Sequence, residues 1–284
     1  MISINSGNKD VRAGALSDMS IATSGGAARA ATRQAPSPWL AAAELPRAVT
    51  EVGLFAATFG GLLYAAARGD GHPVLVLPGL LAGDRSTAPM RAVLNKLGYD
   101  ARAWELGRNR GPRTVGANGE RLMARVEALY QETGKKVSLV GWRLGGGVAR
   151  LGARRMPGRI RPVITLGSPF MDNGDATNAG RIFELASGTK KGDRANRSIF
   201  AELGKPSAIP SAAIYSRSDG ICAWQTCREE PARGRENIEV YGSHCGLGVN
   251  PSVIYAVAGR LAQDEREGAP FAPAGLSAWA YPAA

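Results

Sequence analysis

Residues 137–146 read Val-Ser-Leu-Val-Gly-Trp-Arg-Leu-Gly-Gly, and this stretch decides the fold. With Lys136, its first residues form a largely apolar run that predicts a buried strand over residues 136–140. Gly141 ends the run, Gly145 follows after three residues, and a helical pattern continues to Arg155. Strand and helix approach closely at such a turn, so glycine is the residue that fits both positions. The stretch therefore predicts a strand, a sharp turn and a helix.

Short apolar runs and helical patterns alternate on both sides of this stretch. Strands are predicted at residues 74–78, 99–105, 136–140, 160–166, 212–215 and 238–241. Helices are predicted at residues 86–97, 117–133, 145–155 and 252–262. Strands that alternate with helices indicate a mostly parallel sheet with helices on both faces. The predicted fold class is thus a three-layer α/β sandwich over residues 70–265.

Four further segments complete the predicted organisation. Residues 1–36 are poor in large apolar side chains and are expected to be disordered. Residues 37–69 predict an apolar helical segment, divided into two pieces around Pro46 and packed on the core. Residues 168–208, with a helical patch at 179–186, interrupt the alternation as a small cap. Residues 266–284 form a Pro/Ala-rich tail.

Composition excludes several classes of protein. The chain has 284 residues, of which 44% are hydrophobic and 21% charged, so it is neither a disordered chain nor a disulfide-stapled mini-protein. No uninterrupted apolar run reaches the length of a membrane-spanning helix, which argues against an integral membrane protein. The net charge is +11, but the basic residues are scattered and lie in no nucleic-acid-binding module. No nucleic-acid partner is therefore expected.

The compartment expected from the sequence is the cytoplasm. The three cysteines are an odd number and form no disulfide framework, and the N-terminus has no apolar core typical of a secretory signal. Residues 53–67 are apolar on every helical face, and such a helix is buried or lies against a membrane or a partner. Burial against the domain and peripheral contact with a lipid surface both remain open.

The turn at residues 141–145 has the spacing of a nucleophile elbow, G-x-S-x-G. In that motif a strained turn between strand and helix lifts one side chain above the sheet. Gly141 and Gly145 are the two elbow glycines here, and Arg143 stands at the nucleophile position. The alternative is an ordinary glycine-rich turn without chemistry.

An acid and a histidine follow later strands in the order that such a site needs. Asp219 lies in the loop after the predicted strand at 212–215, and His244 lies after the predicted strand at 238–241. Chemistry in a parallel α/β sheet gathers at the carboxyl ends of the strands. His72 precedes its strand, at the opposite end, and is expected to be structural.

The loop after the first core strand supplies one further part. In this architecture that loop and the residue after the nucleophile each give a backbone N–H that stabilises an oxyanion. The two donors would be the amides of Leu80 and Leu144.

Five stretches resemble bacterial α/β-hydrolases of the esterase/lipase type, and the resemblance covers residues 45–265. They are LPGLLAGD at 77–84, VSLVGWRLGG at 137–146, VITLGSPF at 163–170, IYSRSDG at 214–220 and EVYGSHCGLGVN at 239–250. The resemblance implies an α/β-hydrolase sandwich with Ser-Asp-His chemistry on carboxylic esters and no cofactor. It also implies an apolar ester or acyl ligand held under the cap.

Arg143 departs from this pattern at the nucleophile. A guanidinium stays protonated and cannot attack a carbonyl. The alternatives are poor, because Ser138 lies inside a strand, Ser168 ends a different strand and Cys222 is three residues beyond Asp219, so none is presented by an elbow. We therefore expect serine-type activity to be lost or severely reduced.

Three interpretations of Arg143 remain open. It is a natural loss that leaves a non-catalytic ligand-binding protein, with the guanidinium paired to Asp219 or to an anion. It is a recent one-base change in an intact hydrolase. Or it has a new role, in which it holds a carboxylate or phosphate while Asp219 and His244 activate water.

A metal site is the remaining alternative. Cys222, Cys227, His244 and Cys245 fall within 24 residues, but they lack the usual C-x2-C spacing, and the last two are adjacent. No metal is predicted.

Overall fold

The computed structural model describes residues 35–170, 184, 185, 188, 202, 203, 205, 208–263 and 269–282. Their centre is a six-stranded sheet in the order β2-β1-β3-β4-β5-β6, and every pairing between neighbouring strands is parallel. The strands are β1 Pro73–Leu77, β2 Asp100–Ala103, β3 Val137–Trp142, β4 Ile160–Leu166, β5 Ser211–Tyr215 and β6 Arg235–Glu239. The parallel α/β sheet predicted from the alternating pattern is confirmed.

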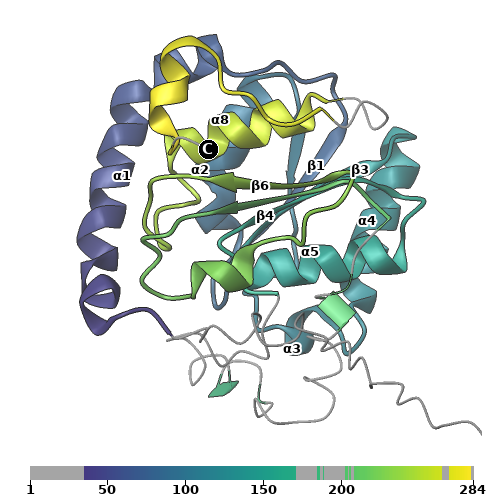
Figure 1. Ribbon diagram of the computed structural model, residues 1–284. Coiled ribbons are helices and arrows are strands. Elements are labelled where there is room, and N and C mark those ends of the chain that lie inside the picture. Colours follow the sequence, from purple (N-terminus) through teal and green to yellow (C-terminus); the bar gives the residue numbers. More distant parts are fainter. Residues whose placement is uncertain are drawn as a thin grey trace, which may run out of the picture. The chain divides into compact units, whose positions relative to one another are not determined.

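Helices cover both faces of the sheet (Figure 1). They are α1 Pro38–Ala65, α2 Asp84–Lys96, α3 Pro112–Val115, α4 Glu120–Thr133, α5 Leu144–Arg155 and α8 Pro251–Leu261, with 3-10 turns at Trp224–Cys227 and Gly275–Ala280. Alternate strand residues serve opposite faces, as the two-residue period of a strand requires. Val74 and Val76 pack with α2 and α8, and Leu75 and Leu77 pack with α4 and α5.

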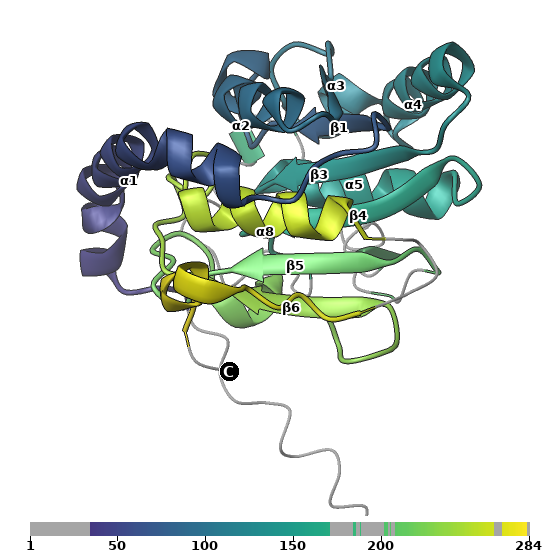
Figure 2. The ribbon, with the colours of Figure 1, turned by 90° about the horizontal axis from the view of Figure 1, so that it is seen from above.

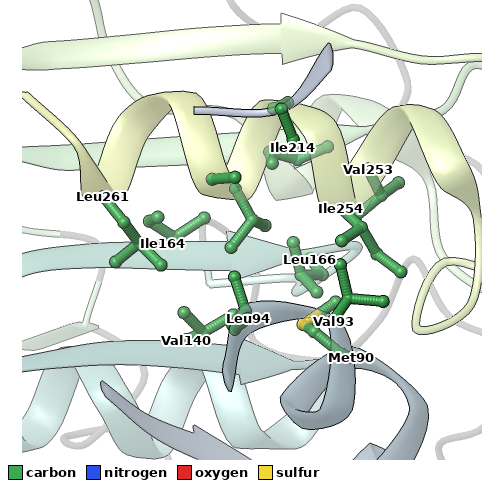
Figure 3. Packing of buried hydrophobic residues seen from close by; sticks show 14 of the residues in the cluster. Met90, Val93, Leu94, Val140, Ile164, Leu166, Ile214, Val253, Ile254 and Leu261 are labelled. Atoms are coloured by element: carbon green, nitrogen blue, oxygen red, sulfur yellow. The ribbon is translucent and has the colours of Figure 1, made fainter. Parts of the chain in front are cut away.

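The larger of the two cores lies between the sheet and the helices α2 and α8. Figure 3 shows its aliphatic side chains interdigitating between strand and helix. The labelled members are Met90, Val93, Leu94, Val140, Ile164, Leu166, Ile214, Val253, Ile254 and Leu261. Burial of these side chains, at about 25 cal/mol per Å² of apolar surface, is what fixes the helices on the sheet.

Strand order defines one place at the edge of the sheet where a site is expected. The chain passes from β1 outward to β2 and then returns to β3 on the other side of β1. In open α/β sheets ligands bind outside the carboxyl ends of the strands at such a reversal. Here these ends lead into Pro78-Gly79-Leu80 after β1 and Arg143 after β3.

Helix α1 differs from its prediction, because it is one helix with Pro46 inside it. Ser37 caps its start by accepting a hydrogen bond from the amide of Leu40 at 3.3 Å, and Pro38 occupies the first turn. Pro46 is exposed, so water can replace the backbone hydrogen bond that proline removes. The predicted division at Pro46 is therefore wrong.

One side of α1 meets the core and the other carries exposed apolar side chains. Leu62 is buried, and Phe55, Phe59 and Leu63 pack against the same core as α8. The exposed large side chains are Trp39, Leu45, Val49, Val52, Leu54 and Tyr64. By length and composition α1 could cross a membrane, and only 11% of its most apolar window is buried. Core helices and signal sequences pass the same length and composition test.

Several boundaries differ from the sequence predictions. The strand predicted at 238–241 is β6 Arg235–Glu239, whose residues pair one to one with β5. Pro162 lies inside β4, at a register irregularity against β3, which is where a strand tolerates a residue without an N–H. In the tail, Phe271 and Tyr281 pack against one another and Tyr255. The segment at 1–34 and most of the predicted cap at 168–208 lie outside the described residues.

Candidate active site

Arg143 lies at the turn between β3 and α5 with φ 57° and ψ −120°. It is one of three non-glycine residues with positive φ in the part of the chain that the structure describes. A residue in this sparsely populated region is strained by about 1–3 kcal/mol and persists only when its surroundings hold it there. The Arg143 amide donates to the carbonyl of Leu166 at 2.9 Å, and its carbonyl accepts from the amide of Gly146 at 3.1 Å. The backbone thus has the strained turn that a nucleophile elbow requires.

The glycines around Arg143 are required by space. A Cβ on Gly141 would lie 2.4 Å from the carbonyl oxygen of Gly145, and one on Gly145 would lie 2.5 Å from that of Leu77. A Cβ on Gly146 would lie 2.0 Å from Ser168 Oγ. Both elbow glycines therefore occupy positions where backbone meets backbone, for the reason that the sequence suggested.

Asp219 and His244 come together although 25 residues separate them. His244 Nδ1 lies 2.5 Å from Asp219 Oδ2, and both side chains are buried. The second carboxylate oxygen, Oδ1, accepts hydrogen bonds from the amides of Ile221 at 2.8 Å and Cys222 at 2.7 Å. Both oxygens of Asp219 are thus engaged, which fixes the carboxylate and, through it, the imidazole ring.

Gly167 contributes to this pair and was not identified from the sequence. It follows β4 with φ +51°, and a Cβ there would lie 3.3 Å from His244 Nδ1 and 3.5 Å from Asp219 Oδ2. It would also lie 2.7 Å from Leu247 Cδ1. The signal in the sequence is the glycine that directly follows a buried strand.

Of the two predicted oxyanion donors, Leu80 lies in the loop after β1 and Leu144 begins α5. Neither the Leu80 nor the Leu144 amide has a hydrogen-bond partner among the described residues. Leu144 is the first residue of α5, where backbone amides lack partners within the helix. Both N–H groups are therefore free to donate to a ligand.

The Arg143 side chain extends along Gly79. A Cβ on Gly79 would lie 2.9 Å from Arg143 Cδ and 3.3 Å from Arg143 Cβ. Within the described part of the chain the guanidinium makes no ion pair or hydrogen bond. The pairing with Asp219 that the sequence left open is absent, and that carboxylate bonds His244 and the amides of Ile221 and Cys222 instead.

No other described side chain near the turn replaces the nucleophile. Ser138 Oγ lies 2.8 Å from His72 Nε2, at the opposite end of the strand, and Ser168 Oγ bonds the carbonyl of Leu166 at 3.3 Å. Burial raises the pKa of the Cys245 thiol, although the Arg143 guanidinium acts in the opposite direction. A protonated thiol is a weak nucleophile.

Three potential metal ligands gather at the site, although the sequence predicted none. Atoms of Asp219, Cys222 and His244 lie within 4.8 Å of one another, and all three residues are buried. A cation there would have to displace the hydrogen bond between Asp219 and His244 or the amides on Asp219 Oδ1. Cys227 and Cys245 lie outside this group, and all three cysteines are free thiols. The existing hydrogen bonds favour an acid–base pair.

Three polar residues of α1 also reach the site and were not identified from the sequence. Glu44, Arg47 and Glu51 bond the loops that carry Asp219 and His244. In the sequence they are isolated charges in an apolar segment, with no local sign of a partner almost 200 residues away.

Comparisons with known proteins support the fold. No protein-family model matches the chain, and no curated protein sequence matches it. Among solved structures, lipase B of Aspergillus fumigatus is similar with a TM-score of 0.53 and 13% identity, over 72% of this chain and 57% of that one. The chain therefore spans little more than half the length of that lipase.

Two more solved structures are similar at lower scores. Lipase BlEst2 of Bacillus licheniformis has a TM-score of 0.48 and 16% identity, over 70% of this chain and 93% of that one. Monoacylglycerol lipase of Paleococcus ferrophilus has a TM-score of 0.48 and 12% identity, over 68% and 96%. Identities this low speak to the fold alone. Together with the sheet order, the comparison confirms the α/β-hydrolase fold.

Proposed function

We propose, from the α/β-hydrolase fold, that this chain is built as a carboxylic ester hydrolase of the esterase/lipase type and that Arg143 abolishes or severely reduces its serine-type activity. One observation carries the proposal. Arg143 has the strained backbone of a nucleophile position, with φ 57°, on the same edge of the sheet as an Asp219–His244 pair at 2.5 Å. A turn that only connects a strand to a helix requires neither a strained residue nor a nearby acid–histidine pair.

The remaining parts have defined roles. With a hydroxyl at position 143, His244 would accept its proton, Asp219 would hold the imidazole, and the Leu80 and Leu144 amides would stabilise the oxyanion. Arg143 has no lone pair to offer, because its guanidinium stays protonated. Without the nucleophile no acyl-enzyme forms, and only the contribution of binding and the oxyanion donors is left.

A fluorophosphonate probe tests the loss directly. Such probes form a covalent adduct with a serine that is activated by a neighbouring histidine. Intact-mass measurement of the parent chain should show no adduct, whereas Arg143→Ser should gain one and Arg143→Ala should not. An adduct on the parent chain would show that another serine is activated and would overturn the proposed loss.

A non-catalytic binding role is the second candidate, and the free guanidinium favours it. Arg143 lacks a partner among the described residues and lies beside the oxyanion loop, where the Leu80 and Leu144 amides are also free. The guanidinium and the two amides together could donate hydrogen bonds to a carboxylate, a group that Arg binds well. The ligand class is an acyl chain with a free carboxylate, the product of ester hydrolysis.

Calorimetry separates this binding role from an empty site. We expect octanoate to bind the parent chain, octanamide to bind more weakly, and Arg143→Gln to lose the preference for octanoate. Equal affinity of both ligands for the parent chain would refute carboxylate recognition.

The outer face of α1 is proposed to contact an anionic lipid surface. Trp39 and Tyr64 are 85% and 91% exposed near the two ends of the helix, and such side chains favour membrane interfaces. Both carboxylates of α1 are buried, so this face carries no negative charge, and the chain has a net charge of +11. The free thiols fit a reducing compartment, so the chain is proposed to be cytoplasmic and peripheral to a membrane.

A matched pair of tryptophans tests the lipid surface. Trp39 and Trp279 are 85% and 86% exposed. Trp39→Glu should weaken sedimentation of the chain with phosphatidylglycerol vesicles, whereas Trp279→Glu should not. Equal sedimentation of the two variants would refute the role of α1.

A further inference from the structure

Residues 38–54 of helix α1 have their polar and apolar faces reversed relative to a surface helix, whereas further along the helix Phe55, Phe59, Leu62 and Leu63 face the core in the usual way. Large apolar side chains point to solvent, whereas Glu44 and Glu51 are buried. Residues 44, 47 and 51 follow one another at three- and four-residue spacing, so they lie on one face of the helix. Figure 2 shows α1 at the end of the sheet toward which β5 points, where the acid and histidine loops lie.

Glu44 joins the two loops with one carboxylate. Its Oε1 accepts a hydrogen bond from the amide of Gly220 at 2.8 Å, and its Oε2 accepts one from the amide of Cys245 at 2.8 Å. Gly220 directly follows Asp219, and Cys245 directly follows His244. Each end of the acid–base pair is therefore held through the next residue in the chain, by hydrogen bonds to an ionisable carboxylate that is 2% exposed.

Arg47 makes the same connection on the other side of the two residues. Its guanidinium donates to the carbonyl and the hydroxyl of Ser218, both at 2.7 Å, and to the carbonyl of Gly242 at 2.6 Å. Ser218 precedes Asp219, and Gly242 lies two residues before His244. Both loops are thus bonded to α1 on each side of the functional residue.

Glu51 fixes the histidine loop a second time. Its oxygens accept hydrogen bonds from the amide of Ser243 at 2.6 Å and from the hydroxyl of Ser243 at 2.7 Å. Ser243 directly precedes His244 and is buried.

Glycines in the two loops provide independent support, because they occur where α1 comes closest. A Cβ on Gly220 would lie 2.4 Å from the carbonyl oxygen of Leu40, in the first turns of α1. A Cβ on Gly246 would lie 1.2 Å from Glu51 Oε2. Both loops are shaped to receive this helix.

We propose that α1 is a positioning element, in which Glu44, assisted by Arg47 and Glu51, sets the separation and orientation of Asp219 and His244. Buried charges stabilise a fold no better than apolar side chains of similar size, so adhesion alone does not account for two buried carboxylates and a partly exposed guanidinium on one helix face. Their hydrogen bonds fix the positions of the two loops, which the sheet anchors only where they leave β5 and β6. The proposal rests on the proposed function only in treating Asp219–His244 as the acid–base pair.

The proton shared by Asp219 and His244 gives a readout in the parent chain, without any activity. With histidine labelled by ¹⁵N, the Nδ1 proton of a short buried hydrogen bond appears as a low-field NMR signal, and His72→Gln distinguishes the signal of His244 from that of His72, whose Nδ1 contacts Asp70. Glu44→Gln keeps the shape of the side chain, but its NH₂ group would face the amide N–H of either Gly220 or Cys245, so one of these two hydrogen bonds is lost. We expect this variant to shift the signal or to broaden it by exchange with water.

Leu45→Gln is the matched control, because Leu45 is the next residue and is exposed. It should leave the signal unchanged. If Glu44→Gln does not fold, Arg47→Gln, whose side chain is partly exposed, gives the same readout. A variant of either residue that melts at lower temperature but keeps an unchanged signal would overturn the proposal, since α1 would then only stabilise the fold.

Kinetics in the Arg143→Ser background provide the second measurement. Adding Glu44→Gln should lower kcat by about 10- to 100-fold with little change in KM, because misplacement by about 1 Å has effects of that size. Lower stability with unchanged kcat would overturn the proposal. If Arg143→Ser is inert, the proposed function fails, and the NMR signal of the parent chain still decides the role of α1.

Discussion

Replacement of Arg143 by serine should create an esterase from a chain that has almost no such activity. The structure holds His244 Nδ1 2.5 Å from Asp219 Oδ2, and the Leu80 and Leu144 amides have no hydrogen-bond partner among the described residues, so under the proposed function a hydroxyl is the missing part. A serine triad acts as a unit that contributes about 10⁶-fold to kcat. Supplying its last member should therefore lower the barrier by about 8 kcal/mol.

The assay is hydrolysis of p-nitrophenyl esters from acetate to octanoate, at equal concentrations of folded protein. Arg143→Ala is the matched control, because it removes the guanidinium without adding a hydroxyl. Arg143→Ser/His244→Ala should lose the gain, since it keeps the hydroxyl without its base. Stability should change by less than about 1 kcal/mol, because the guanidinium has no partner to lose among the described residues.

Two results would refute the reasoning. If Arg143→Ser is folded and inert with every acyl length, the site has diverged beyond its nucleophile, and the binding role becomes the better account. If the parent chain hydrolyses esters and needs Arg143, the guanidinium has a catalytic role of its own.

Three further predictions concern stability. Gly141→Ala should destabilise the fold by about 3 kcal/mol or more, because its Cβ would lie 2.4 Å from a backbone oxygen. Gly158 has open space around it, so Gly158→Ala should change the free energy of unfolding by less than about 0.5 kcal/mol. Equal urea midpoints for the two variants would contradict this. Arg143→Gly should stabilise the fold by about 1 kcal/mol. The substitution relieves about 1–3 kcal/mol of backbone strain, but it costs about 1 kcal/mol because glycine has more conformational freedom in the unfolded chain. A destabilised variant would show that the turn is unstrained. Burial lowers the pKa of His72 in the folded chain, so on acidification His72 is protonated at a higher pH in the unfolded chain than in the folded one. The free energy of unfolding should therefore be highest above about pH 7 and should fall as the pH drops below about 6.5. His72→Gln should flatten this slope in urea titrations from pH 5 to 7.5, and the assignment fails if only His244→Gln does so.

Much of the fold was predictable because its signals are local. The apolar run Ile160–Leu166 has the same bounds as β4, and the spacing of Gly141 and Gly145 reports a close approach within five residues. Asp219 and His244 were identified because each lies in the loop that follows a strand, and parallel strands bring such loops to one edge of the sheet. The sequence analysis did place the last strand too late, because the half-buried β6 lacks a strong apolar pattern.

The role of α1 could not be predicted, because its partners are distant in sequence. A glutamate in an apolar helix usually marks the solvent side, and nothing near Glu44 or Glu51 indicates that their partners lie in two loops 176 to 201 residues later. The apolar pattern of α1 left burial and a lipid surface both open, and the structure buries Leu62 of this helix while it exposes Trp39 and Tyr64. Pro46 was misread for a related reason, since its effect depends on which side of the helix meets water.

The distance along the chain between Glu44 and its partners also sets an order of events during synthesis. At about 5–20 residues per second, the ribosome needs about 10–40 s after Glu44 to reach Cys245, which lies 201 residues later. Until Gly220 has been made, 176 residues after Glu44, neither carboxylate of α1 has its loop partner, while β1, β3 and β4 can already pair. Asp219 and His244 are thus oriented only after the chain has been made as far as Cys245, and a nascent chain released earlier carries the elbow without this oriented pair.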